Sequence, residues 1–334
     1  MNRTQNSSRS VPPVQRTFVR EKWIALFGIL MAIALPALLI TVGGWGAPSK
    51  REAVWDDRQI CICRHDGEGE EKQSLSAVLA LCLAATNGSD TPAQSLCAQG
   101  VALRSRAIWW MDYCTETGEE DDSSVPHLCD SPSHGLPYLS MEELEAMYGK
   151  EEAAARLQAG EKAVESTKGM VLCYEGEIVP ALLHHSSYGS TRGADQLHWV
   201  SVVSTPEEES RTQLKYTVEE LRLLLAAAFG VEISPKPWEW SFTVEKDRNG
   251  WVTFVKMGEV SVSGDAFAAA LSIPSVNFSL QAEKDGLAVT AVGEGSGCGL
   301  SRRGAAVYAE SGLSWQEILA HYFPKCTVES ITAS

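Results

Sequence analysis

Four side chains of the types that bind zinc lie within 21 residues of an otherwise acidic stretch. They are Cys114, His127, Cys129 and His134. Structural zinc sites use four nitrogen or sulfur ligands in a tetrahedral arrangement. The spacing therefore predicts a structural zinc ion that organises a long loop, and the alternative is a set of free thiols and surface histidines.

A second group of metal-binding residue types, Cys61-x-Cys63-x-His65, lies nearer the N-terminus. Two cysteines separated by one residue make an unusual zinc knuckle, so we interpret them as a surface thiol pair. The chain has nine cysteines in total, an odd number. Cys82 and Cys97 stand in apolar helical surroundings and are expected to be buried small hydrophobic residues. The sequence does not assign disulfide pairing.

The sequence predicts mainly helices in the first half of the chain and mainly strands in the second half. Apolar periodicity predicts helices over residues 74–85, from Pro92 to about Tyr113, and over the segments MEELEAMYG and KEEAAARLQAGEKAVES. From Gly169 onwards short strands dominate, and the first two form a hairpin around Glu175-Gly176. Strands and helices that do not alternate strictly indicate an α+β fold.

The N-terminal region predicts a membrane anchor. Residues 23–45 are apolar and uncharged, long enough to cross about 30 Å of hydrocarbon. Five basic residues and one acidic residue precede them, which places residues 1–22 in the cytoplasm and the rest outside the cell. A cleaved signal peptide is the alternative, but the polar lead is long and GWGAPSK contains no Ala-x-Ala-like cleavage site. We expect a stalk over 46–73, one domain over 74–326 and a tail over 327–334.

The charge of the chain limits its partners. The first 22 residues carry +4, so the remaining residues carry −19 of the total of −15. An acidic outer domain argues against nucleic acid as a partner, and against simple charge attraction to anionic wall polymers.

The segment LCAQGVALRSRA, Leu96 to Ala107, resembles the signature helix of the stage II sporulation protein D (SpoIID/LytB) family. Further blocks match the family in the same order: TKGMVLCYEGEIVPALLH with HHSSYGST, VSGDAFAAALSIPSVNFSL, GSGCGLSRRGA and SWQEILAHYFP. Together they cover about residues 74 to 324. The resemblance implies a mixed helix and sheet domain outside the cell, and the activity of a lytic transglycosylase that cleaves peptidoglycan glycan strands.

One departure from the family affects the chemistry directly. Thr86 stands where the resemblance implies an acidic residue. A lytic transglycosylase needs a carboxyl that donates a proton to the leaving oxygen and later accepts one, and a threonine hydroxyl does neither. Asp90 is the nearest substitute acid, with a solvated turn residue before the helix as its other interpretation.

Several polar residues of the matching blocks remain candidates for glycan contact. The resemblance assigns this role to Gln99, Arg104, His184, Ser186, Ser187, Ser296 and Arg302. Ser296 stands where the family usually has histidine, and Arg302 and Arg303 also depart from it. The arginines could pair with a lactyl or peptide carboxylate. Satisfied structural histidines and solvated arginines are the alternative.

The resemblance extends to the predicted zinc site. CDSPSH is similar to a metal-binding insertion of some family members, with Gly135 in place of a further cysteine, for which Cys114 compensates. We therefore expect a membrane-anchored, SpoIID-like wall protein of sporulation with a degenerate site that binds glycan, with other membrane-anchored sporulation proteins as candidate partners. The alternatives are an active transglycosylase that uses Asp90, and a protein-interaction scaffold without glycan affinity.

Overall fold

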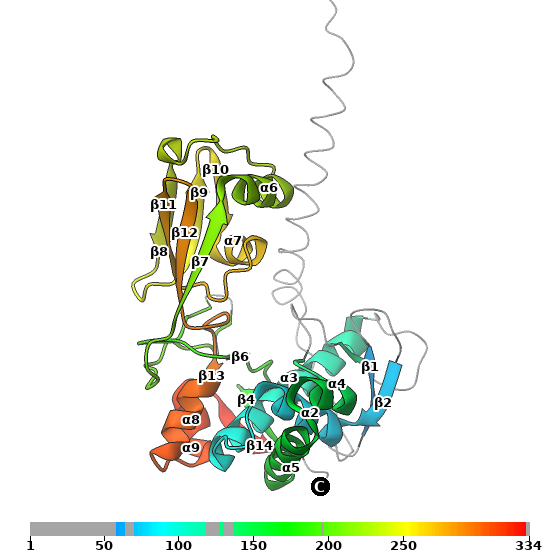
Figure 1. Ribbon diagram of the computed structural model, residues 1–334. Coiled ribbons are helices and arrows are strands. Elements are labelled where there is room, and N and C mark those ends of the chain that lie inside the picture. Colours follow the sequence, from blue (N-terminus) through cyan, green and yellow to red (C-terminus); the bar gives the residue numbers. More distant parts are fainter. Residues whose placement is uncertain (1–57, 64–69, 118–126, 130–135, 195–196, 332–334) are drawn as a thin grey trace, which may run out of the picture. The chain divides into compact units, whose positions relative to one another are not determined.

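The computed structural model describes residues 58–63, 70–117, 127–129, 136–194 and 197–331 (Figure 1). Arg51–Ser334 form one compact unit of helices and small sheets, so the α+β prediction is confirmed. No helix within the described ranges is long and apolar enough to cross a membrane. The predicted anchor at residues 23–45 and the cytoplasmic tail before it lie outside those ranges.

A three-stranded sheet opens the described fold. β1 (Gln59–Cys63) pairs antiparallel with β2 (Glu70–Ser74) and parallel with β3 (His127–Cys129). Ile60, Ile62 and Leu128 from this sheet are buried in the same core as the first helices. The predicted stalk over 46–73 is therefore wrong for both strands. The pairing of β1 with β3 joins segments far apart in the sequence. The polar composition of residues 46–73 gives no sign of these strands. Cys61 is fully buried and Cys63 half-buried, so the interpretation of a surface thiol pair is wrong.

Four helices follow at the predicted places: α2 (Leu75–Thr86), α3 (Ala93–Thr117), α4 (Met141–Tyr148) and α5 (Lys150–Ser166). Ser74 caps α2 by accepting a hydrogen bond from the backbone of Ala77, and Ser140 and Glu143 form a capping box on α4. α2 packs closely against α5, because Gly160 has no side chain where a Cβ would lie 2.7 Å from the Ala80 carbonyl oxygen.

The predicted hairpin is confirmed between β4 (Met170–Tyr174) and β5 (Glu177–Ile178). Glu175 and Gly176 both have positive φ, as a tight hairpin turn requires. β5 is much shorter than the apolar run suggested, because Pro180 has no backbone N–H for further pairing. β14 (Thr327–Ser330) pairs with the other edge of β4, so the first half of the predicted tail is a strand instead.

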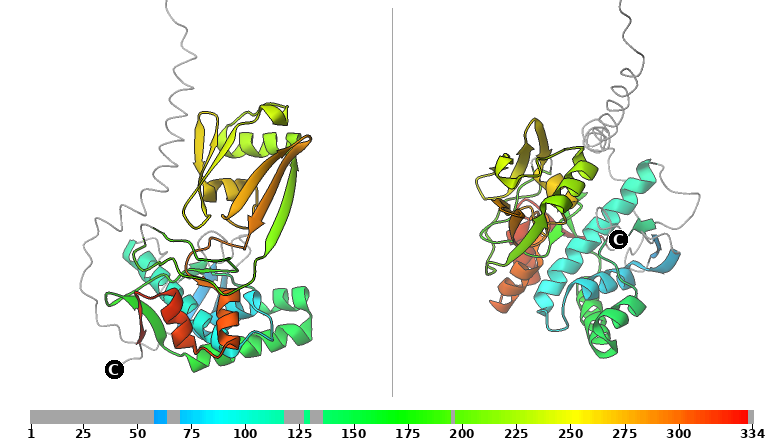
Figure 2. Two further views of the ribbon diagram at one scale, coloured as in Figure 1. Left: turned by 90° about the vertical axis from the view of Figure 1, so that its left-hand side faces the viewer. Right: turned by 45° about the horizontal axis from the view of Figure 1, so that its top comes forward.

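A second group of strands and helices is inserted in the sequence between β6 (Leu183–His184) and β13 (Leu300–Ser301). It contains the strands β7 (Arg211–Thr217), β8 (Phe242–Lys246), β9 (Val252–Met257), β10 (Val260–Ser263), β11 (Phe278–Glu283) and β12 (Gly286–Val292), with the short helix η2 (Pro237–Glu239). The sheet orders are β10-β9-β8 and β11-β12-β7. Helix α6 (Val218–Phe229) packs against β7 and β12, and α7 (Gly264–Ala270) packs against β9 and β10 (Figure 2).

Two helices that precede β14 in the sequence lie beside the signature helix. α8 (Arg302–Glu310) and α9 (Trp315–Tyr322) both pack against α3, which contacts α5 as well (Figure 2). The short strands β6 (Leu183–His184) and β13 (Leu300–Ser301) pair in parallel. This pairing brings the histidine and serine loop next to the start of α8, where the candidate site residues gather.

Candidate functional site

Thr86 is the last residue of α2, and its side chain is hydrogen-bonded to the backbone of that helix. Its hydroxyl donates to the Cys82 carbonyl oxygen over 2.9 Å. The adjacent Asn87 amide donates to the hydroxyl oxygen over 3.1 Å and to the Leu83 carbonyl over 3.0 Å. A serine or threonine hydroxyl has one proton to give, so the proton of Thr86 is used within the protein.

Gln99 holds the loop after α2 from the side of α3. Its amide donates to Asn87 Oδ1 over 3.0 Å and to Ser95 Oγ over 3.1 Å, and its oxygen accepts from Asn87 Nδ2 over 3.0 Å. Gln99 is fully buried. A side chain without exposed surface offers nothing to a sugar, so Gln99 positions the loop and its prediction as a glycan contact is corrected.

Asp90 lies exposed at the far end of the same loop. Its carboxylate lies close to Gly88, where an added Cβ would be only 2.6 Å from Asp90 Oδ1. The Thr91 amide donates to the Gly88 carbonyl over 3.2 Å and closes a turn there. These contacts match a turn residue at the entry to α3.

A carboxylate that the sequence analysis missed reaches this loop from α5. Glu152 accepts hydrogen bonds from the Ser89 backbone over 3.3 Å and from the Ser89 hydroxyl over 2.8 Å. Arg156 Nε donates over 2.7 Å to Oε1, the same oxygen that accepts from the Ser89 backbone. The hydrogen bond from Arg156, followed by those from Ser89, lowers the pKa of Glu152. Glu152 is therefore ionised near neutral pH and has no proton for a leaving group. The Glu152–Arg156 spacing was readable from sequence, but the contact with Ser89, 63 residues away, was not.

Arg104 is also corrected as a glycan contact. Its guanidinium is completely buried. It donates to the Val164 carbonyl over 3.1 Å and to the Met170 carbonyl over 3.2 Å. Arg104 thus holds the end of α5 against the start of β4, which is a structural role.

His184 and Ser187 form a buried pair behind the serine loop. His184 Nδ1 lies 3.1 Å from the Cys298 carbonyl, and Nε2 lies 3.0 Å from Ser187 Oγ. Burial lowers the pKa of His184 to about 4, so the ring is neutral at neutral pH. Because a carbonyl only accepts, Nδ1 carries the proton, and the single hydroxyl proton of Ser187 lies between two acceptors, His184 Nε2 and Glu207 Oε1. Ser186 is equally buried, so none of the three presents its side chain to a glycan, contrary to the prediction.

Glu207 completes this buried cluster and was also missed. Its Oε1 accepts from the Ser187 backbone over 2.8 Å, from Ser187 Oγ over 3.2 Å and from Ser301 Oγ over 2.5 Å. Its Oε2 has no hydrogen-bond partner among the described residues. A Cβ on Gly304 would lie 2.5 Å from Oε2 and 2.1 Å from the Tyr322 hydroxyl. Glycine at this position therefore makes room for both oxygens. Burial, and then Glu207, raise the pKa of Tyr322.

The accessible part of the serine loop is a mixed charged surface formed by His185, Tyr188, Glu294 and Arg302. Glu294 exchanges backbone hydrogen bonds with Ser186, and its carboxylate lies 4.0 Å from His185 Nε2. Burial lowers the pKa of His185; Glu294 opposes this shift, and Arg302 and Arg303 add to it. Tyr188 is 48% exposed. Of the predicted contacts in this region, Arg302 and Ser296 retain accessible surface.

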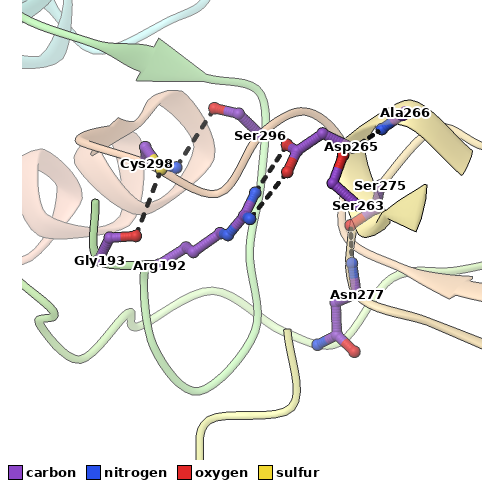
Figure 3. Close-up of polar contacts among 9 residues, drawn as sticks. All are labelled: Arg192, Gly193, Ser263, Asp265, Ala266, Ser275, Asn277, Ser296 and Cys298. Carbon is purple, nitrogen blue, oxygen red and sulfur yellow. Dashed lines mark hydrogen bonds and ion pairs between the residues drawn. The ribbon is translucent and has the colours of Figure 1, made fainter. Parts of the chain in front are cut away.

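Ser296 lies on the glycine-rich turn, which is fixed from two sides (Figure 3). Its hydroxyl accepts from the Cys298 backbone over 3.3 Å. Arg192 makes two parallel hydrogen bonds to the Asp265 carboxylate, of 2.7 and 2.8 Å, and its backbone donates to the Gly297 carbonyl. Arg192 therefore connects the turn to the start of α7, as charge-assisted bidentate pairs do well.

All four predicted zinc ligands lie outside the described side chains. The backbone of Cys114 belongs to α3 and that of His127 and Cys129 to β3, while His134 lies outside the described residues altogether. Among the side chains that the structure describes, no group of three or more His, Cys, Asp or Glu could hold a metal ion. The zinc prediction therefore stays a prediction.

Comparison with known proteins confirms the resemblance. Residues 71–174 match the family model for SpoIID, Stage II sporulation protein. Stage II sporulation protein D of Bacillus subtilis is 26% identical over 192 residues, which cover 56% of this chain and 55% of that protein. Its namesake in Bacillus amyloliquefaciens is 26% identical over 235 residues, 66% of each chain. An uncharacterized protein of Brachyspira hyodysenteriae is 24% identical over 246 residues, 70% of this chain and 61% of its own. The matches thus span about half to two thirds of these relatives.

Proposed function

From its similarity to stage II sporulation protein D, we propose that this chain is a membrane-anchored wall protein of sporulation that binds peptidoglycan glycan without cleaving it. The observation that carries the proposal is Thr86, which stands where the family resemblance implies the acid. Its hydroxyl proton is donated to the Cys82 carbonyl. Loss of general acid catalysis lowers a rate typically by about 10²- to 10⁴-fold.

No neighbouring carboxyl described here has the properties of a replacement acid. Asp90 is exposed in a turn at the entry to α3, not enclosed in an apolar pocket. Glu152 has a lowered pKa, the opposite of what a proton donor needs. Glu207 is 3% exposed and lies behind Ser187, so a glycosidic oxygen has no access to it.

Accessible groups remain that suit a glycan chain. Tyr188 offers a half-exposed ring face, and a ring that is apolar with a polar tip suits the mixed surface of a sugar. Arg302 lies at the start of α8 next to this loop, and a guanidinium suits the carboxylate of a lactyl or peptide group. Binding by these groups requires no acid at Thr86.

Two assays on the same material test the proposal. The chain is incubated with insoluble peptidoglycan for a pull-down, and with denuded glycan strands to look for 1,6-anhydromuropeptides. We expect retention without product, and weaker retention of Tyr188→Ala and Arg302→Ala. Leu223→Ala is the matched control, because Leu223 is 66% exposed on α6, away from the serine loop.

The other outcomes identify the alternatives. Robust anhydromuropeptide formation that survives Thr86→Ala and vanishes with Asp90→Ala would establish an active transglycosylase and overturn the proposal. Neither retention at low salt nor product would instead favour a protein-interaction scaffold.

The membrane anchor is proposed on the sequence of residues 23–45 and the five basic residues before it. The full-length chain is expected in the membrane fraction, and a chain that lacks residues 1–45 in the supernatant. Release of the full-length chain by high salt or carbonate would contradict an anchor that spans the bilayer.

A further inference from the structure

Glu207 is the inward-facing member of a run of three glutamates. Glu208 and Glu209 are exposed, as a solvated charge run predicts, whereas Glu207 is only 3% exposed. Glutamate is almost never this buried unless it is paired. The partners of Glu207 come from the serine loop and from the start of α8, so this exception in the charge run indicates a specific role for its carboxyl group.

One oxygen of Glu207 holds two segments that are far apart in the sequence. Oε1 accepts from the Ser187 backbone over 2.8 Å, from Ser187 Oγ over 3.2 Å and from Ser301 Oγ over 2.5 Å. Ser187 belongs to the serine loop, and Ser301 caps α8 by accepting from the Gly304 backbone over 3.1 Å. The serine loop and the first turn of α8 are therefore fixed at one shared atom.

The two serines held by Glu207 each precede a residue that we propose for glycan contact. Tyr188 follows Ser187, and Arg302 follows Ser301. Consecutive Cα atoms are about 3.8 Å apart, so a shift of either serine moves the neighbouring side chain with it. Tyr188 is 48% exposed and Arg302 retains accessible surface, while Glu207 is buried. Glu207 thus sets the separation of both groups without reaching a ligand itself.

The surroundings of Glu207 leave its carboxyl group little freedom to turn. A Cβ on Gly304 would lie 2.5 Å from Oε2 and 2.1 Å from the Tyr322 hydroxyl, so both oxygens lie against the backbone of α8. Tyr322 is fully buried. On the other side, the hydroxyl of Ser187 lies between Glu207 Oε1 and His184 Nε2. The carboxyl group therefore provides a fixed reference point for the loop.

We propose that Glu207 is a positioning residue for glycan binding, which fixes Tyr188 and Arg302 at the separation that a glycan strand requires. The inference rests on the proposed function of glycan binding and adds to it a residue that touches no sugar. Such a role depends on where the oxygen lies more than on its charge. When the two segments are loosened, their side chains must be ordered during binding, and this ordering weakens affinity.

Two conservative replacements separate the position of the oxygen from its charge. Glu207→Asp keeps the carboxyl group but withdraws it by one methylene, and it should weaken retention on insoluble peptidoglycan about tenfold. Glu207→Gln has nearly the same shape and keeps an oxygen acceptor, so it should retain most of the binding. A role that depends on charge predicts the reverse order. Glu208→Asp and Glu208→Gln, at the adjacent exposed position, are the matched controls and should bind as the unaltered chain does.

Combined variants separate positioning from general support of the fold. If Glu207 acts through Tyr188, Tyr188→Ala should weaken retention much less in a Glu207→Asp chain than in the unaltered chain, because coupled sites are not additive. Arg104 instead holds α5 to β4. In an Arg104→Met chain the effect of Tyr188→Ala should therefore remain full, as independent sites predict.

Hydrogen exchange in the unaltered chain tests the anchor without glycan and without any variant. The Ser187 amide is buried and donates to Glu207 Oε1, so it should exchange far more slowly than the amide of the exposed Glu208. Equally fast exchange of both amides overturns the inference, as does normal retention of Glu207→Asp or a full effect of Tyr188→Ala in that chain; these results leave the proposed function in place. Failure of the unaltered chain to bind peptidoglycan overturns the proposed function, and this inference with it.

Discussion

At the scale of single residues, the end of α2 sets the chemistry available to this chain. Thr86 is part of a polar network in which each described donor has an acceptor within the protein. A glutamate carboxyl at the same position would reach two carbons further and has a proton to exchange. The proposal of glycan binding without cleavage therefore depends on one side chain and its environment.

Thr86→Glu is expected to raise glycan cleavage. The glutamate carboxyl would supply the missing general acid, which contributes typically about 10²- to 10⁴-fold. The rate of 1,6-anhydromuropeptide release measures the effect. Thr86→Gln has nearly the same size without an acidic proton and is the control. Equal, unchanged rates in both variants would mean that more than the acid has been lost.

His184 makes stability depend on pH. Burial lowers its pKa from 6.5 to about 4 in the folded chain, so between these values the unfolded chain binds a proton that the folded chain does not. Stability is therefore lost as the pH falls from about 6.5 to about 4, by up to about 3 kcal/mol. The free energy of unfolding, measured by urea denaturation across this pH range, should depend less steeply on pH in His184→Gln. His198→Gln, at an exposed position, should keep the slope, and an unaltered slope in His184→Gln would refute the assignment.

At the scale of elements, the end of α5 depends on a side chain from α3. Arg104→Met keeps most of the buried volume but removes the guanidinium donors from the Met170 and Val164 carbonyls, of which Val164 still accepts from the Thr167 backbone. A buried acceptor that loses its donor costs about 1–3 kcal/mol, so urea denaturation should show a loss of that size. Arg303→Met at an exposed position should change stability by less than about 0.5 kcal/mol. Normal stability together with lost glycan retention in Arg104→Met would restore Arg104 as a glycan contact.

Two glycines within helices differ in what surrounds them. Gly160→Ala should destabilise the chain, because its Cβ would lie 2.7 Å from the Ala80 carbonyl and force α5 away from α2. Gly100→Ala meets only side-chain atoms at 3.7 Å, so it should gain up to about 1 kcal/mol of helix propensity. Thermal unfolding of the two variants compares them directly. A Gly160→Ala chain as stable as Gly100→Ala would mean that the two helices can separate without cost.

Local patterns predicted the elements, and non-local pairing produced the errors. The hairpin at Glu175-Gly176 and the helix caps depend on residues a few positions apart, which the sequence shows directly. The contact between Ser89 and Glu152 and the pairing of β1 with β3 join residues more than 60 positions apart. Residue types alone also did not distinguish buried polar side chains, such as Gln99 and His184, from exposed ones.

At the scale of the whole molecule, the signature helix α3 is above all a packing element. Leu96, Leu103 and Ile108 belong to the core shared with α2 and α5, whereas Ala98 and Val101 belong to the core shared with α8 and α9. Small residues on one side and large ones on the other let α3 pack between two layers. This requirement does not involve an acid at Thr86, so the frame can persist without catalysis.

The net charge of −15 makes a prediction about how the chain binds the cell wall. If local polar and aromatic contacts hold glycan against an overall repulsion from anionic wall polymers, salt screens only the repulsion. Retention on insoluble peptidoglycan should then stay constant or increase as sodium chloride rises from about 0.05 to 0.5 M, a range over which the Debye length falls from about 14 to about 4 Å. A strongly basic protein on the same material is the control and should elute over this range. If the chain elutes together with the basic protein, wall binding depends on charge attraction, and the accessible arginines near the serine loop, more than Tyr188, account for it.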